Sequence, residues 1–173
     1  MLTCPPVADI TLDGTPCHTS GDLPRPGDSS PPFRLVDGRL ADVTLKSFPG
    51  KVKILSVLPS LDTSVCATST RKFSERVAGL PNVVFIVVSA DLPFAMQRFC
   101  GLEKLQNVVP LSMMRGRGFA KDYGTLIVDG PFEGLSARAV VVVDTEDRVV
   151  HAQLVREIAD EPDYDAALAA ATR

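Results

Sequence analysis

The sequence predicts a layered α/β protein in which helices flank a mixed central sheet. Short apolar runs, which are typical of buried strands, alternate with segments of helical pattern from residue 52 onward. The last two apolar runs are separated only by a short polar turn, which predicts an antiparallel pair and makes the sheet mixed. A length of 173 residues suits one domain, so we expect a single domain over residues 1–173.

The N-terminal part of the chain is expected to be irregular apart from one hairpin. Residues 8–20 predict this hairpin, because apolar and polar residues alternate on either side of the turn sequence Asp13-Gly14. Residues 21–32 are rich in proline and glycine and predict an extended connector. Short strand or turn segments are expected at residues 33–36 and 42–45.

The remaining chain predicts the sheet and its helices. Buried strands are expected in the apolar runs at residues 52–58, 82–89, 107–111, 139–143 and 149–155. Helices are expected at residues 64–78, 93–99 and 163–171. In sheets of this kind, functional sites lie at the carboxyl ends of the strands, so the segment after residue 58 is of particular interest.

Composition and charge exclude several classes of protein. The net charge is −3 and the basic residues form no long block, so no nucleic-acid partner is implied. The chain lacks the long apolar run of a transmembrane helix and the basic start of a secretory signal, so no membrane partner is implied either. We therefore expect a cytoplasmic protein, in which cysteines are more often catalytic or redox-active than structural.

The main candidates for chemistry are the cysteines Cys4, Cys17, Cys66 and Cys100. They form no C-x-x-C pair, and the histidines lie in no metal-binding pattern, so neither a zinc site nor a thioredoxin-type dithiol is indicated. Cys66 differs from the others because it falls in the first turn of the helix expected at residues 64–78. Unpaired backbone N–H groups and the helix dipole at that position favour the nucleophilic thiolate.

Thr63 and Pro59 precede Cys66 at a spacing that gives both of them a place in the same site. The Thr63 hydroxyl is placed either to donate a hydrogen bond to the Cys66 sulfur or, equally, to serve a peroxide oxygen, and Pro59 shapes the pocket wall at the strand end. The alternative is that Cys66 is a small buried core residue and that Thr63 caps the helix. Spacing alone leaves both interpretations open.

The stretch Pro59-Ser60-Leu61-Asp62-Thr63-Ser64-Val65-Cys66 resembles the P-x-x-x-T-x-x-C motif of the peroxiredoxins, and in full that of their thiol peroxidase group. The similarity extends over about residues 8–170, with further motifs at residues 89–95, 98–100, 129–131, 134–135, 137–140 and 161–164. This resemblance implies a thioredoxin-like fold. It also implies a thiol-dependent peroxidase that reduces hydrogen peroxide and organic hydroperoxides with no metal or organic cofactor.

The resemblance implies a role for each matching residue. Cys66 matches the peroxidatic cysteine, which is oxidised to a sulfenic acid, and Cys100 matches the resolving cysteine, which joins it in an intrachain disulfide. Arg138 matches the arginine that polarises thiolate and peroxide, while Pro59 and Thr63 match pocket residues, with Thr63 available to a peroxide oxygen. Thioredoxin as the reductant and a homodimer are implied as well.

Residue patterns alone leave other interpretations open. Arg138 begins the apolar strand at residues 139–143, where it fits a strand end that reaches solvent; if it were buried, its charge would need a partner. Cys100 is expected just beyond the helix at residues 93–99 and fits an inert core cysteine. Cys4 and Cys17 match no catalytic position and are interpreted as incidental.

Two alternative functions fit the same fold. A thiol–disulfide oxidoreductase is disfavoured by the absent C-x-x-C motif. A non-catalytic interaction module is disfavoured because all the motif residues occur together. The sequence departs from the family pattern at Leu102, Lys104, Met113 and Met114. Because Cys66 and Cys100 are expected in different packed segments, the disulfide is expected to require local unfolding.

Overall fold

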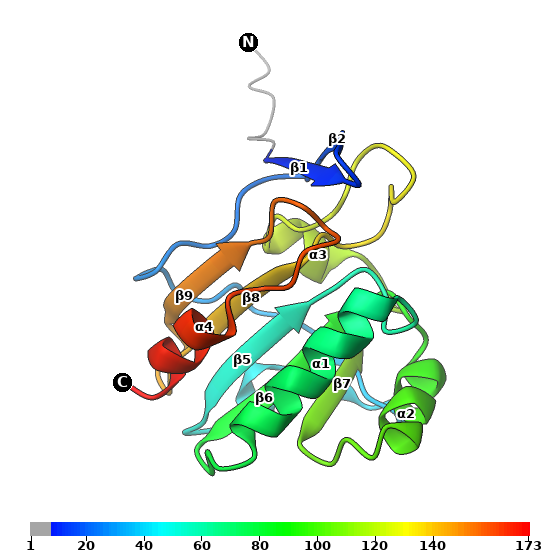
Figure 1. Ribbon diagram of the computed structural model, residues 1–173. Helices are drawn as coiled ribbons and strands as arrows, with labels where there is room; N and C mark the ends of the chain where they lie inside the picture. The colour runs from blue at the N-terminus through cyan, green and yellow to red at the C-terminus, as the bar shows by residue number, and fades with distance from the viewer. Residues whose placement is uncertain (1–7) are drawn as a thin grey trace.

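The computed structural model describes residues 8–173, which form one central sheet, a separate hairpin and the helices around them (Figure 1). The strands of the central sheet are β3 (Leu35–Val36), β4 (Asp42–Val43), β5 (Val52–Val57), β6 (Val83–Ser89), β7 (Val108–Ser112), β8 (Ala139–Val143) and β9 (Val149–Leu154). The helices are the 3-10 turn η1 (Leu45–Ser47) and the α-helices α1 (Ser64–Val77), α2 (Pro93–Leu102), α3 (Gly118–Asp122) and α4 (Tyr164–Ala171).

The central sheet is mixed, and its strands follow the order β4-β3-β7-β6-β5-β8-β9. Strands β5, β6 and β7 are parallel neighbours, whereas β8 pairs with β5 in the antiparallel sense and β9 pairs with β8 in the same way. At the other edge, β3 is antiparallel to both β7 and β4. The predicted mixed α/β architecture is therefore confirmed, with β5 in the interior of the sheet.

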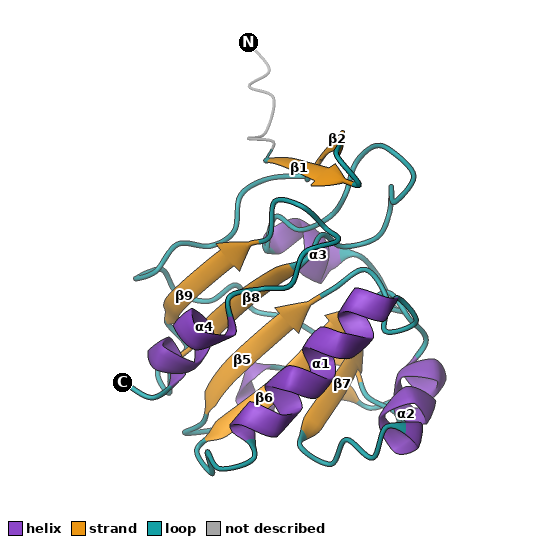
Figure 2. Ribbon diagram, viewed as in Figure 1, coloured by secondary structure: helices purple, strands orange, loops and turns teal. Residues whose placement is uncertain are grey.

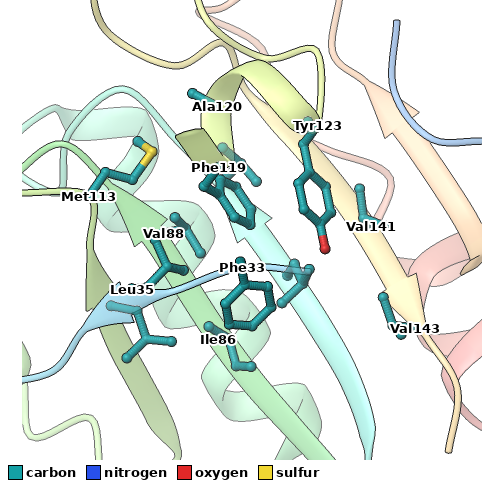
Figure 3. Packing of buried hydrophobic residues seen from close by; sticks show 14 of the residues in the cluster. Phe33, Leu35, Ile86, Val88, Met113, Phe119, Ala120, Tyr123, Val141 and Val143 are labelled. Carbon is teal, nitrogen blue, oxygen red and sulfur yellow. The ribbon is translucent and has the colours of Figure 1, made fainter. Parts of the chain in front are cut away.

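Both faces of the sheet are covered, which is why its central strands are apolar on both sides. Helices α1, α2 and α4 lie on one face, as Figure 2 shows. Phe73 of α1 packs there against Phe85 and Tyr164, with ring centroids 5.0 and 4.8 Å apart. On the opposite face, Phe33 and Tyr123 contact the ring of Phe119 in α3 above strands β6 and β8 (Figure 3).

The predicted N-terminal hairpin is confirmed and stands apart from the central sheet. It consists of β1 (Asp9–Leu12) and β2 (Thr15–His18). Asp13 and Gly14 form its turn with φ values of 50° and 77°, the left-handed backbone that tight two-residue hairpins require. Glu157, which follows β9, accepts hydrogen bonds from the amides of both turn residues at 3.1 and 3.0 Å. The hairpin is thereby fastened to the segment after β9.

Several local expectations need correction. Helix α2 continues to Leu102, so Cys100 lies within this helix and not beyond it. Helix α3 was not predicted, because five residues that begin with a glycine carry little helical periodicity. Within residues 8–173, no helix combines the length and the apolar character needed to cross a membrane.

Candidate active site

Cys66 lies in the first turn of α1, close to the carboxyl end of β5. Thr63 is the N-cap of this helix, with extended backbone angles of −93° and 144°, so Cys66 falls among the backbone N–H groups that begin the helix. The residue is 0% exposed. Its carbonyl accepts hydrogen bonds from the hydroxyls of Ser69 at 3.0 Å and Thr70 at 2.8 Å, which fixes the first turn internally.

Arg138 brings a positive charge to the Cys66 sulfur. Its Nη2 donates to Sγ of Cys66 at 3.3 Å, Nη1 donates to the Ser69 hydroxyl at 3.5 Å, and Nε donates to the carbonyl of Ile158 at 3.0 Å. The residue is 3% exposed, so the alternative of a strand end that reaches solvent is wrong. A charge-assisted donor at this position stabilises an anionic sulfur more than a neutral one.

Thr63 is placed differently from the expectation. Its hydroxyl donates to the carbonyl of Ser60 at 3.1 Å and makes no hydrogen bond with the Cys66 sulfur. It also makes no side-chain cap bond to the helix, although it is the N-cap residue. The nearby backbone carbonyl competes successfully for the hydroxyl, as is common for threonine in turns. Thr63 therefore belongs to the pocket wall together with Pro59.

A cavity of about 220 Å³ lies over the start of α1. Part of its wall comes from the motif itself, and part from the hairpin turn and from segments late in the chain. Its lining residues are Leu12, Asp13, Pro59, Thr63, Ser64, Val65, Phe132, Arg138, Ile158 and Ala159. Cys66 does not line the cavity, whereas Arg138, which donates a hydrogen bond to its sulfur, does. Arg138 therefore lies between the cavity and the buried sulfur.

Asp91 holds the loop that precedes Cys66. Its carboxylate accepts hydrogen bonds from the Ser60 hydroxyl at 2.7 Å and the Leu61 amide at 2.8 Å. The Ser89 hydroxyl donates to the same carboxylate at 2.8 Å. Asp91 was missed as a site residue although it lies in a motif shared with the family. The contact joins segments that are 30 residues apart in the chain, and local pattern does not report such a contact.

Cys100 occupies a different environment. It lies half-buried in the last turns of α2. It borders a groove of about 560 Å³, which is separate from the cavity of about 220 Å³ over the start of α1. Burial raises the pKa of its thiol to about 11, so the thiol stays protonated at neutral pH in this conformation. Both Cys66 and Cys100 are free thiols in the structure.

Cys17 lies apart from the candidate site. It is a free, buried thiol in β2, which fits the interpretation that it is incidental. Cys4 lies outside the described residues. Among residues 8–173, no three side chains of the His, Cys, Asp and Glu types gather closely enough to hold a metal ion.

Comparison with known proteins places this chain in a single class. A family model described as Redoxin matches residues 25–168. The chain is 50% identical over 164 residues to the thiol peroxidase of Leptospira interrogans, and the match covers 94% of this chain and 96% of that protein.

Solved structures agree with the sequence match. A peroxiredoxin-like protein from Aquifex aeolicus has a TM-score of 0.88 at 39% identity, with 95% of this chain and 96% of the other covered. A thiol peroxidase from Chromobacterium violaceum has a TM-score of 0.86 at 30% identity, with 91% of each chain covered. The chain thus has the thioredoxin-like fold of the redoxins. Within that class it belongs to the thiol peroxidase family of peroxiredoxins.

Proposed function

We propose that this protein reduces hydrogen peroxide and organic hydroperoxides with Cys66 as the nucleophile and Cys100 as the resolving thiol. The observation that carries the proposal is the hydrogen bond from the Arg138 guanidinium to the buried Cys66 sulfur at 3.3 Å, at the edge of a cavity. Membership of the thiol peroxidase family supports a thiol-dependent peroxidase and leaves the roles of individual residues to be tested.

In the first step, the Cys66 thiolate attacks one oxygen of the peroxide. A sulfur–oxygen bond forms, the O–O bond breaks, and the departing oxygen leaves as water or as an alcohol after it takes up a proton. Cys66 is left as a sulfenic acid. Arg138 supports this step because its guanidinium donates to the sulfur and the residue lines the cavity, so we propose that it stabilises the thiolate and the oxygen that gains negative charge.

In the second step, the Cys100 thiol attacks the Cys66 sulfenic acid. The S–S bond forms, the S–O bond breaks, and the hydroxyl leaves as water with the thiol proton. The raised pKa of Cys100, about 11, supports this division of roles, because a protonated thiol does not compete with Cys66 for peroxide. Cys100 becomes reactive only when it leaves its half-buried position.

The cycle closes when a dithiol reductant exchanges with the disulfide and restores both thiols. Thioredoxin is proposed as this reductant and a homodimer as the working form, because these properties accompany the family resemblance. The expected cytoplasmic location stays part of the proposal. The cycle as written needs no metal or organic cofactor, because each step exchanges only bonds to sulfur and oxygen. The proposal extends to the pocket residues Pro59 and Thr63, which line the cavity beside Arg138.

Peroxide consumption in the presence of thioredoxin and its reductase tests the nucleophile. Cys66→Ser is expected to reduce turnover to background, because a hydroxyl is a far weaker nucleophile than a thiolate. Cys17→Ser is the matched control, since it removes another buried thiol and is expected to keep full turnover. Substantial activity in Cys66→Ser would overturn the proposal. Disulfide exchange without peroxide consumption by the wild type would favour the thiol–disulfide oxidoreductase.

Peptide mapping without reductant tests the resolving residue. One equivalent of peroxide is expected to produce a single intrachain link between Cys66 and Cys100. Cys100→Ser is expected to stop at the Cys66 sulfenic acid, which a dimedone-type probe traps, and to over-oxidise more readily. A dominant link through Cys4 or Cys17, or between chains, would contradict the role of Cys100 and leave that of Cys66 intact.

A further inference from the structure

An ion pair joins the helix that carries Cys66 to the end of the helix that carries Cys100. Arg71 of α1 donates through Nε to Oε2 of Glu103 at 2.6 Å and through Nη2 to Oε1 at 3.1 Å. Glu103 is the C-cap of α2. The two parallel hydrogen bonds form the fork geometry that arginine makes with a carboxylate, which fixes orientation as well as distance.

The end of α2 is less buried than its beginning. Pro93 and Met96, the buried residues of α2, both lie in its first half. The residues from 97 to 102 are half-buried or exposed, and the groove of about 560 Å³ runs along Cys100. Fully buried residues therefore anchor the beginning of α2, whereas its last turns are held by the partial packing of Phe99 and Cys100 against the α1-side cluster, by backbone hydrogen bonds and by the contact with Arg71.

We propose that the Arg71–Glu103 ion pair is a positioning contact that holds the last turns of α2 closed against α1 and thereby sets the rate at which Cys100 reaches the oxidised Cys66. The inference rests on the proposed disulfide between these cysteines. Opening of the pair frees the segment around Cys100, whose sulfur then attacks the sulfenic sulfur with loss of water. A closed pair instead leaves the sulfenic acid exposed to a second peroxide molecule.

The other ion pairs of α1 connect it to a different part of the fold. Arg76 pairs with Asp165 at 2.6 Å and Lys72 pairs with Glu161 at 2.7 Å, and both contacts lead to α4 or to the segment just before it. Among the ion pairs of the described residues, Arg71–Glu103 is the contact from α1 to the end of α2. The side chains are 42% and 31% exposed, so we expect a modest effect of about two- to fivefold that salt weakens.

Glu103→Gln tests the contact. Asp165→Asn is the matched control, because it removes the carboxylate of the ion pair that joins Arg76 of α1 to α4. In the reduced protein, Glu103→Gln is expected to speed amide hydrogen exchange at residues 99–105 by about two- to fivefold. Disulfide formation after one equivalent of peroxide is expected to accelerate by a similar factor, with less over-oxidation at high peroxide. Asp165→Asn is expected to change neither. A charge-swapped variant, Arg71→Glu with Glu103→Arg, is expected to restore slow exchange and slow resolution.

Unchanged exchange at residues 99–105 in Glu103→Gln, or an equal increase in Asp165→Asn, would overturn the positioning role. Slower disulfide formation in Glu103→Gln would overturn it as well. A wild-type protein that never forms the Cys66–Cys100 link would contradict the proposed function instead. In that case the exchange comparison still decides whether the ion pair keeps α2 closed, because it uses the reduced protein and needs no peroxide.

Discussion

Arg138 shows how much of the site depends on the shape of one side chain. Its three nitrogens donate to three different acceptors: the Cys66 sulfur, the Ser69 hydroxyl and the Ile158 carbonyl. The carbonyl sets where the guanidinium stands, and the hydroxyl of Ser69 also donates to the backbone of Cys66. The planar fork therefore aligns the charge with the first turn of α1, which a rotating ammonium group does not do.

Arg138→Lys is expected to keep the fold and to lower kcat/KM for peroxide by about 10- to 100-fold, which is the loss expected when a charge-assisted hydrogen bond is removed. A lysine keeps the charge but cannot hold the sulfur and the Ile158 carbonyl together. Stopped-flow measurement of Cys66 oxidation checks the rate, and a thermal melt checks the fold. Wild-type kcat/KM in a folded variant would show that the charge alone suffices.

At the scale of elements, the hairpin and α1 build one wall of the site together. Leu12 ends β1, Asp13 begins the hairpin turn and Val65 comes from α1, yet all of them line the cavity of about 220 Å³. Glu157 makes this possible, because its carboxylate accepts hydrogen bonds from the Ala159 amide, the Thr11 hydroxyl and the turn amides. This carboxylate fastens the turn amides, beside the backbone hydrogen bonds that join Thr11 to Arg156 and Ile158.

These hydrogen bonds, first that of the Ala159 amide and then those of the hairpin, lower the pKa of Glu157 from its ordinary 4.5 to about 2. A lowered carboxyl pKa means that the folded state prefers the anion, so the contribution is complete above about pH 4.5 and is lost as pH falls toward 2. We expect the hairpin turn to detach within this window.

Amide exchange and chemical shifts of Asp13 and Gly14 followed by NMR against pH are the measurement. Glu157→Gln is expected to loosen the same amides at neutral pH, because a neutral amide is a weaker acceptor and offers only one oxygen. The amides of β5 serve as the internal control and are expected to stay protected. Equal protection of the turn amides in Glu157→Gln and wild type would contradict the anchoring role.

At the scale of the molecule, formation of the proposed disulfide competes with the packing of the two helices that carry the cysteines. Cys66 is part of the apolar cluster on the α1 side of the sheet, and Cys100 packs against the edge of that cluster from another helix. A disulfide needs Cα atoms no more than about 7 Å apart. The proposed disulfide would join cysteines that lie in the packed turns of two different helices, so we expect the segments that carry them to give way, whereas the sheet beneath is buried on both faces.

Hydrogen exchange of the fully oxidised protein is expected to rise at residues 59–70 and 93–105 relative to the reduced protein. Strands β5, β6 and β8 are expected to remain protected in both states, because they form the interior of the sheet. Mass spectrometry of peptic fragments measures the difference. Uniform exchange changes across the sheet, or none in either segment, would contradict local unfolding as the route to the disulfide.

The sequence by itself determined the order of the elements, the mixed sheet, the hairpin and the position of Cys66 at a helix start. Apolar runs and turn residues report local burial and local geometry, and these features depend on little else. The same reasoning ended α2 too early and missed α3, because short segments with weak periodicity are shaped by what they pack against. It also considered the Cys66 sulfur as an acceptor for the Thr63 hydroxyl, whereas the carbonyl of Ser60 accepts that hydrogen bond.

Only the tertiary structure decided which side chains meet. Arg138 and Cys66 are 72 residues apart, and the Glu157 carboxylate reaches a hairpin turn 144 residues away. No local pattern carries such a pairing. The carbonyl of Ile158 that positions the guanidinium belongs to the backbone, which every residue possesses. The residue type at this position therefore does not predict the contact. Burial of Arg138 depends on these partners because a charge enters an apolar interior only where its donors are satisfied.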